Sequence, residues 1–164
     1  PEKYKIKGSF GHPVPVVDGK TQSSGAKASA IVLKKEFTDV KDLLCIDYTS
    51  AYSTPSLDKL VRIFVYDRQG KGSFTVGDEF TANAPIRFET AITTQANWKI
   101  IDDTHLLLTT GTEQMTVTIE ASGKVAFTSE TIEVNSPAYT RIGISLKEQS
   151  KDGYIRLTMR TKQL

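Results

Sequence analysis

The sequence is short of the side chains that most often carry chemistry. It holds one cysteine, Cys45, and two histidines, His12 and His105, among its 164 residues. A lone cysteine cannot close an internal disulfide, which excludes the disulfide-rich class of small secreted domains and favours a reducing compartment. Neither histidine lies at a metal-ligand spacing from the cysteine or from the other histidine. We therefore expect no metal site and no cofactor.

Long apolar runs and catalytic motifs are also missing. No segment approaches the roughly 20 apolar residues of a transmembrane helix, and the first residues lack the features of a signal peptide. The patterns G-x-S-x-G, H-E-x-x-H and G-x-x-x-x-G-K-[ST] do not occur. The sequence therefore predicts a protein that is not an enzyme and has no membrane partner. It begins at Pro1 without a methionine, so a preceding basic arm or signal can be missing from view.

The sequence also has little net charge. The formal net charge is +2, which does not identify a nucleic-acid-binding protein because such proteins need clustered Lys and Arg. Whether the protein binds nucleic acid therefore depends on where its Lys and Arg residues cluster.

What the sequence does contain is a β pattern. In the stretch 60–67, β-branched residues alternate with Arg62, Phe64 and Tyr66, as in a strand that is buried on both faces. Similar segments separated by Ser-Gly and Asp-Gly turns predict an all-β antiparallel sandwich of jelly-roll type with about eight to ten strands. The expected strands lie near 27–34, 42–50, 60–67, 86–92, 96–101, 104–110, 114–120, 124–134, 139–147 and 153–161.

Two regions depart from this pattern. Residues 75–80 predict one short helical turn, with Ser73 or Thr75 as N-cap and Gly77 limiting its length. Residues 1–25 are rich in proline, glycine and polar side chains, which predicts an extended arm or edge segment. Residues 26–164 then form a single sandwich domain.

The stretch VRIFVYDRQGKG at 61–72 combines an apolar strand with a Gly-Lys-Gly loop. Such a loop can cradle phosphate when it opens a helix at the spacing of a P-loop. Neither the spacing nor the helix context is present here. We therefore expect Gly70 and Gly72 to let the chain turn sharply off a strand.

Aromatic residues and one acidic cluster allow two interpretations each. Trp98, Phe74, Phe80 and Phe88 fit a sandwich core better than a stacking platform for bases or sugars. Around His105, the adjacent acids at 102–103 fit the chemistry of a turn between two strands better than an acid–base cluster.

The last expected strand has one cationic face. Ile155, Leu157 and Met159 point to one side, and the cations between and after them point to the other. This face is either solvated surface or a contact for nucleic acid or an acidic partner. The candidate contact residues, with an alternating run from the amino terminus, are Arg156, Arg160, Lys162, Lys3, Lys5 and Lys7.

The segment 61–80 resembles a segment in the coat proteins of small single-stranded DNA viruses, particularly geminivirus-like ones. The matching residues are Val65, Tyr66, Asp67, Arg68, Gln69, Gly72 and Phe80. The resemblance implies a jelly roll that self-assembles into an icosahedral shell around a single-stranded genome, inside the host cell, and resides in the virion. The chain departs from that family in lacking an Arg-rich arm.

Two other interpretations stay open. The order of motifs also resembles plant viral movement proteins of the thirty-kilodalton family, which implies cell-to-cell movement and single-stranded nucleic-acid binding. A non-viral, calycin-like or sandwich binding domain is the third, with Trp98 and neighbouring aromatics lining a ligand pocket.

Overall fold

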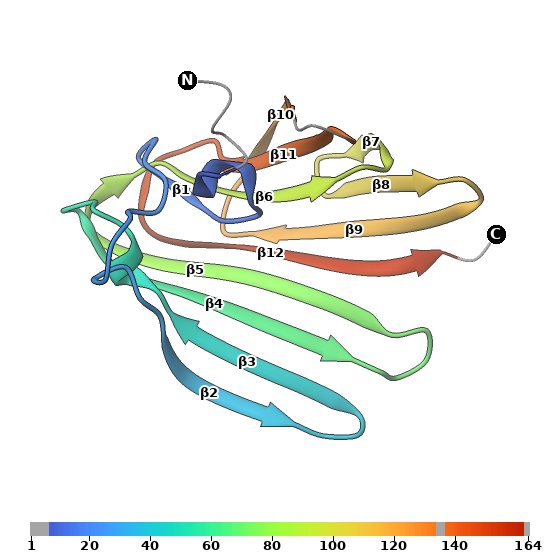
Figure 1. Ribbon diagram of the computed structural model, residues 1–164, viewed down its shortest axis with the longest axis horizontal. Coiled ribbons are helices and arrows are strands. Elements are labelled where there is room, and N and C mark those ends of the chain that lie inside the picture. The colour runs from blue at the N-terminus through green and yellow to red at the C-terminus, as the bar shows by residue number, and fades with distance from the viewer. Residues whose placement is uncertain (1–6, 134–136, 163–164) are drawn as a thin grey trace.

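A computed structural model describes residues 7–133 and 137–162, and Figure 1 shows them as two antiparallel β-sheets. The larger sheet has eight strands, in the order β2 (Ile31–Phe37), β3 (Lys41–Asp47), β4 (Leu57–Asp67), β5 (Ser73–Ile86), β12 (Ser150–Lys162), β9 (Glu113–Ala121), β8 (His105–Thr110) and β7 (Asn97–Asp102). The smaller sheet has four, in the order β1 (Val16–Val17), β6 (Phe88–Thr94), β11 (Tyr139–Leu146) and β10 (Val125–Ile132).

The predicted all-β antiparallel sandwich is confirmed. The described residues contain two short 3₁₀ turns, η2 (Ser9–Gly11) and η3 (Thr49–Ala51), and no α-helix. None of the described helical segments is long and apolar enough to cross a membrane. The strands number twelve in the described residues, more than the expected eight to ten.

The predicted helical turn at 75–80 is wrong, because these residues lie inside β5. β5 occupies a central position in the larger sheet, between β4 and β12, so its backbone is hydrogen-bonded on both sides. Asp78, Phe80 and Ala82 are buried and alternate with the exposed residues at 79 and 81, as in a strand. Tertiary pairing therefore overrides the local cap signals that predicted a helix.

The Gly-Lys-Gly loop is the turn of the β4–β5 hairpin. Gly70 and Gly72 have φ angles of 60° and 75°, which are in the left-handed region that glycine adopts without strain. The Asp67 carboxylate accepts a hydrogen bond from the backbone N–H of Gln69 at 2.8 Å and helps to close the turn. The interpretation of this loop as a sharp turn is confirmed.

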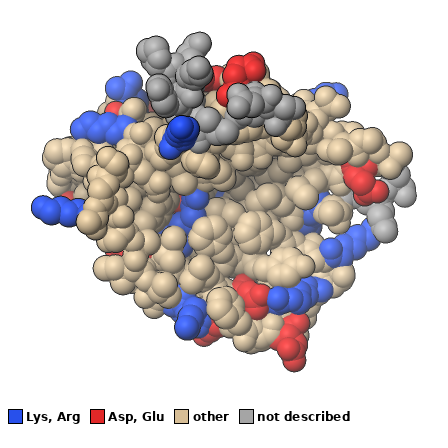
Figure 2. Space-filling view, viewed as in Figure 1, with Lys and Arg blue, Asp and Glu red and all other residues tan. Residues whose placement is uncertain are grey.

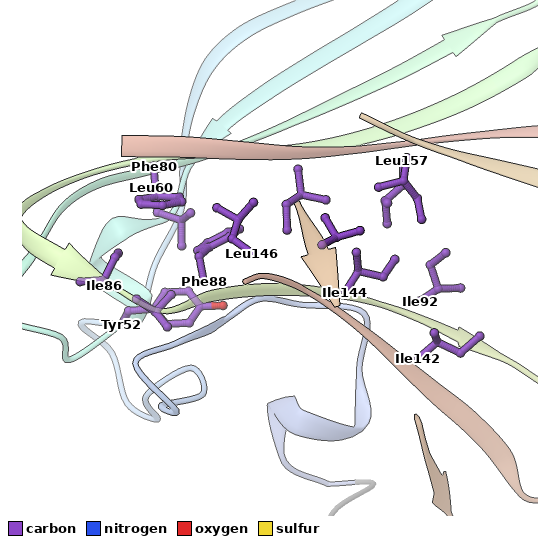
Figure 3. Packing of buried hydrophobic residues seen from close by; sticks show 14 of the residues in the cluster. Tyr52, Leu60, Phe80, Ile86, Phe88, Ile92, Ile142, Ile144, Leu146 and Leu157 are labelled. Atoms are coloured by element: carbon purple, nitrogen blue, oxygen red, sulfur yellow. The ribbon is translucent and has the colours of Figure 1, made fainter. Parts of the chain in front are cut away.

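The core lies between the two sheets (Figure 3). Leu60 and Phe80 point into it from the larger sheet, and Phe88 and Ile144 meet them from the smaller one. The rings of Phe80 and Phe88 stack with centroids 4.6 Å apart. The core interpretation is confirmed for both rings, and Trp98 packs partly against the same cluster.

The smaller sheet covers only part of the larger one. The buried residues beneath it come from β4, β5, β12, β9 and β8, whereas β2 and β3 extend beyond it in Figure 1. Every residue of β2 is exposed, although the strand includes Ile31, Val32 and Leu33. The inner face of the larger sheet is therefore core at one end and surface at the other.

Candidate functional site

The uncovered end of the inner face presents three aromatic rings. Phe64 and Tyr66 come from β4 and Phe74 from β5, where Tyr66 stands directly opposite Phe74. The rings of Phe64 and Phe74 stack with centroids 6.4 Å apart. Tyr66 is 45% exposed and Phe74 is 38% exposed. We call these three residues the aromatic strip.

The strip ends at a cation that already has partners. The Arg68 guanidinium lies over the Tyr66 ring, 4.7 Å from its centroid. Arg68 also donates to the Asp42 carboxylate at 2.5 Å and to the Thr38 carbonyl at 3.1 Å. The hydrogen bond between the two side chains lowers the pKa of Asp42 and raises the pKa of Arg68. The charge beside the strip is therefore neutralised within the domain.

The apolar surface continues from the strip toward the edge strand. Val32 and Phe37 stand opposite Ile46 and Asp42 on the same inner face, and they are 56% and 66% exposed. Figure 2 shows the surface beneath the smaller sheet as hollowed and mostly tan, with charged side chains gathered toward its lower edge. We call the aromatic strip together with Val32 and Phe37 the uncovered face.

A buried ion pair lies where the strip meets the core. Asp78 accepts hydrogen bonds from Arg62 Nε at 2.7 Å and Nη2 at 2.8 Å. It also accepts from the Tyr48 hydroxyl at 2.6 Å and from the Thr90 hydroxyl at 2.7 Å. Burial acts to lower the pKa of Arg62, but Asp78 raises it above its ordinary value. Burial and the neighbouring Asp78 charge raise the pKa of Tyr48.

The same region holds the N-terminal stretch in place. Arg62 Nη1 donates to the Pro13 carbonyl at 2.7 Å, and the Tyr52 hydroxyl donates to the Pro15 carbonyl at 2.8 Å. From the smaller sheet, the Tyr139 hydroxyl donates to the Gly11 carbonyl at 2.6 Å. These donors reach the stretch from both sheets and from the η3 region, so they fix it against the sandwich.

The cations predicted to bind nucleic acid or an acidic partner are only partly described. Lys3 and Lys5 lie outside the described residues, and Lys7 is exposed. Lys162 is the last residue of β12, and Arg160 is exposed. Arg156 lies within 3.6 Å of Glu79 and 3.3 Å of Glu120. The contact stays a prediction, and the charge of Arg156 is balanced by two acids.

The structure also tests the interpretations of Phe74 and of the acids near His105. The core interpretation is wrong for Phe74, which lies in the aromatic strip. The turn at Asp102 is confirmed, because its Oδ1 atom accepts from the Thr104 N–H at 2.7 Å and lies 2.9 Å from His105 Nδ1. The described residues contain no group of three or more metal-ligating side chains.

Sequence reasoning missed the aromatic strip, although its signal was present. Arg62, Phe64 and Tyr66 alternate along β4, and this pattern by itself predicts a strand buried on both faces. Alternation places these side chains on one face but does not say how far the opposite sheet reaches. Whether these side chains are core or surface depends on how far the smaller sheet extends over the larger one.

No family model matches the chain, and no curated protein matches its sequence. Solved structures do match. Heparinase III matches 98% of the chain with a TM-score of 0.74 and 16% identity, over 25% of its own length. The heparan sulfate lyase HepC from Pedobacter heparinus matches 93% with a TM-score of 0.73 and 13% identity, over 24% of its length. A heparinase III with methylated lysines matches 93% with a TM-score of 0.67 and 11% identity.

These matches contradict the resemblance to viral coat and movement proteins, and with it the capsid function and the virion as location. The matching residues Val65 to Phe80 form the β4–β5 hairpin, and strand alternation with a glycine turn recurs in hairpins of unrelated proteins. Self-assembly and nucleic-acid contact lose the support of that resemblance and stay predictions.

The non-viral sandwich interpretation agrees best with the matches. At these identities the likeness shows a shared fold, and the chain spans about a quarter of the length of the heparinases that it matches.

Proposed function

We propose that this chain is the β-sandwich domain of a polysaccharide lyase that acts on an acidic polysaccharide of the heparan sulfate type. The observation that carries the proposal is the match of 98% of the chain to a quarter of heparinase III. Nearly every described strand thus has a counterpart in one part of a larger lyase. Fold alone does not fix function, so the surfaces of the domain must agree with the proposal.

The uncovered face has the properties of a surface that packs against another part of the same lyase. It exposes Phe37, Tyr66 and Phe74 side by side with aliphatic residues of the edge strand. Clustered exposed apolar side chains mark interaction surfaces, and aromatic residues are enriched at protein interfaces. The uncovered face therefore fits a protein partner within the lyase.

The aromatic strip is poorly suited to holding the acidic polysaccharide itself. A sulfate or carboxylate is best bound by cations that are not already satisfied. Arg68 is paired with Asp42, and Arg62 is buried against Asp78. An anion at the strip would have to compete with these carboxylates, so we assign the strip to domain packing.

The decisive experiment measures lyase activity of the polypeptide in which this domain occurs. Heparan sulfate is incubated with it, and the unsaturated sugar that a lyase leaves at the cut end is followed by its ultraviolet absorbance. We expect cleavage. The absence of cleavage of heparan sulfate and of related acidic polysaccharides would contradict the proposal.

A pair of matched variants tests the role of the uncovered face. Phe74→Asp places a charge in the aromatic strip, and Tyr154→Asp places one at a similarly exposed ring, since the two residues are 38% and 37% exposed. Tyr154 lies on β12 and points to the opposite face of the sheet. We expect Phe74→Asp to lower the activity and the Tm of the whole polypeptide, and Tyr154→Asp to leave both nearly unchanged. Equal effects would show that this face is not a packing surface.

A further inference from the structure

A groove of about 570 Å³ crosses the outer face of the smaller sheet at one end of its strands. Its floor is a row of residues that stand opposite one another on β1, β6, β11 and β10. They are Val16, Glu89, Ser145 and Ala126. The neighbouring Phe88 and Leu146 turn into the core, which places the groove on the side that faces away from the larger sheet. Ligand sites typically occupy about 300–1,000 Å³, so the groove is large enough for a sugar residue.

Two exposed cations line the groove, Arg87 and Lys147. The backbone of Arg87 is fixed by two hydrogen bonds with Asp18, from Arg87 N to Oδ1 at 2.8 Å and from Asp18 N to the Arg87 carbonyl at 2.9 Å. The backbone N–H of Lys147 donates to the Lys124 carbonyl at 2.9 Å. Hydrogen bonds therefore hold the backbone at Arg87 and at Lys147 in place.

The side chains of these two cations form no ion pair with an acid in the part of the chain that the structure describes, although the Asp18 carboxylate lies beside the Arg87 backbone. This distinguishes them from Arg68 beside the aromatic strip and from Arg156 on β12, which both have carboxylate partners. An incoming anion would meet no protein carboxylate already bound to Arg87 or Lys147.

Glu89, the acid in the floor, repels an incoming anion only weakly because it is paired with Arg141. The Glu89 carboxylate accepts from Arg141 Nη1 at 2.7 Å, and the Arg141 side chain is only 2% exposed. A close pair of this kind has little net charge. The Ser145 hydroxyl and the apolar side chains of Val16 and Ala126 complete a floor that can meet the hydroxyls and C–H groups of a sugar ring.

From this arrangement we propose that the groove binds an acidic sugar residue, with its carboxylate or sulfate held between Arg87 and Lys147. The guanidinium of Arg87 can bind two oxygens of such a group at once, and Lys147 supplies a second positive charge. The choice of ligand rests on the proposed function, whereas the site rests on its own geometry. The groove lies on the opposite sheet from the uncovered face, so packing at that face leaves it open.

The test is a binding titration of the 164-residue chain with a heparan sulfate oligosaccharide, followed by calorimetry. The double variant Arg87→Gln with Lys147→Gln removes both cations of the groove. The control, Lys41→Gln with Lys99→Gln, removes the same charge from exposed positions on β3 and β7. We expect the groove variant to weaken binding by roughly tenfold for each cation removed, and the control to change it little. Added salt should weaken binding to the unaltered chain more than to the groove variant.

Each outcome decides a separate question. Failure of the unaltered chain to bind the oligosaccharide, or equal losses in the two double variants, overturns the groove as a sugar site. Displacement of the oligosaccharide by inorganic sulfate at equal concentration identifies a simple anion site and overturns the sugar assignment. If the groove variant loses binding but the larger polypeptide cleaves no acidic polysaccharide, the groove stands and the proposed lyase function fails.

Discussion

At the scale of single residues, Asp78 is the centre of the buried hydrogen-bond network. Its two oxygens accept four hydrogen bonds, from Arg62, Tyr48 and Thr90. Arg62 in turn reaches the Pro13 carbonyl of the N-terminal stretch. One carboxylate thereby connects the larger sheet, the smaller sheet and that stretch.

Asp78→Asn tests this connection. The change keeps the shape of the side chain but leaves the buried Arg62 charge without a counter-charge, which costs about 3–5 kcal/mol for pairs of this kind. We expect a loss of that order in the free energy of unfolding measured in urea. Asp103→Asn, at an exposed position in the β7–β8 turn, is the control and should change little. A loss no larger than in the control would mean that the network adds nothing to stability.

Asp102 gives a pH-dependent prediction. The Thr104 N–H, the Thr104 hydroxyl and His105 hydrogen-bond its carboxylate and lower the pKa to about 2 from 3.8. Because the pKa is lowered in the folded state, the stabilisation is present above the ordinary pKa and is lost as the pH falls through about 2. An NMR titration of the Asp102 carboxyl carbon should show this midpoint. A midpoint near 3.8 would show that the hydrogen bonds do not persist in solution.

At the scale of elements, two glycines in the middle of strands have different reasons to be there. A Cβ atom on Gly143 of β11 would lie 2.5 Å from the Thr128 hydroxyl oxygen and 2.8 Å from the Glu89 carboxylate, which Arg141 holds in place. A Cβ atom on Gly77 of β5 would meet the Arg156 side chain at 3.6 Å, an ordinary contact.

Alanine substitutions should therefore separate the two positions. Gly143→Ala forces neighbouring groups apart, and overpacking of this kind typically costs about 1–3 kcal/mol. Gly77→Ala has room and gains from a less flexible unfolded chain, by roughly 0.5–1 kcal/mol. Chemical denaturation of both variants measures the difference. Equal effects would show that the β6–β11 region yields easily to the added methyl group.

At the scale of the whole molecule, the unequal sizes of the two sheets determine which backbone amides are protected from hydrogen exchange. β5, β12 and β9 are central strands beneath the smaller sheet, with buried residues such as Phe80, Leu157 and Ile119. β2 is an edge strand whose residues are all exposed. Amide groups open most easily where few apolar contacts hold them.

Hydrogen exchange should follow this gradient. In the 164-residue chain we expect the amides of β2 and β3 to exchange much faster than those of β5, β12 and β9. In a lyase that contains this domain, the proposed packing of the uncovered face should slow exchange in β2 and β3. Mass spectrometry of peptides from both forms makes the comparison, and identical exchange of β2 in the two forms would place the packing surface elsewhere.

Much of the fold could be predicted because strand alternation and turn residues are local. The segments that became β4 and β12 alternate clearly, and Gly70 and Gly72 mark the turn that their φ angles require. β5 was missed because Gly77 and the acids at 78–79 favour a helix start locally, while pairing with two neighbouring strands favours a strand.

The candidate sites were much harder to predict than the fold. Arg87 and Lys147 are 60 positions apart, and only the register of β6 with β11 places them along one groove. The string at Val65–Phe80 suggested a viral family because short hairpin sequences recur, and the overall arrangement of strands corrected it.

The sequence by itself determined that the chain forms antiparallel β-strands, where most of them turn, and which side chains alternate along each strand. These features follow from φ preferences and a period of two residues, which act over a few neighbours. Only the tertiary structure decided which apolar faces are core and which are surface. That depends on how far a four-stranded sheet reaches across an eight-stranded one, which no local pattern specifies. Strand register likewise decided that the Arg68 and Arg156 charges are paired with acids and that Arg87 and Lys147 line one groove.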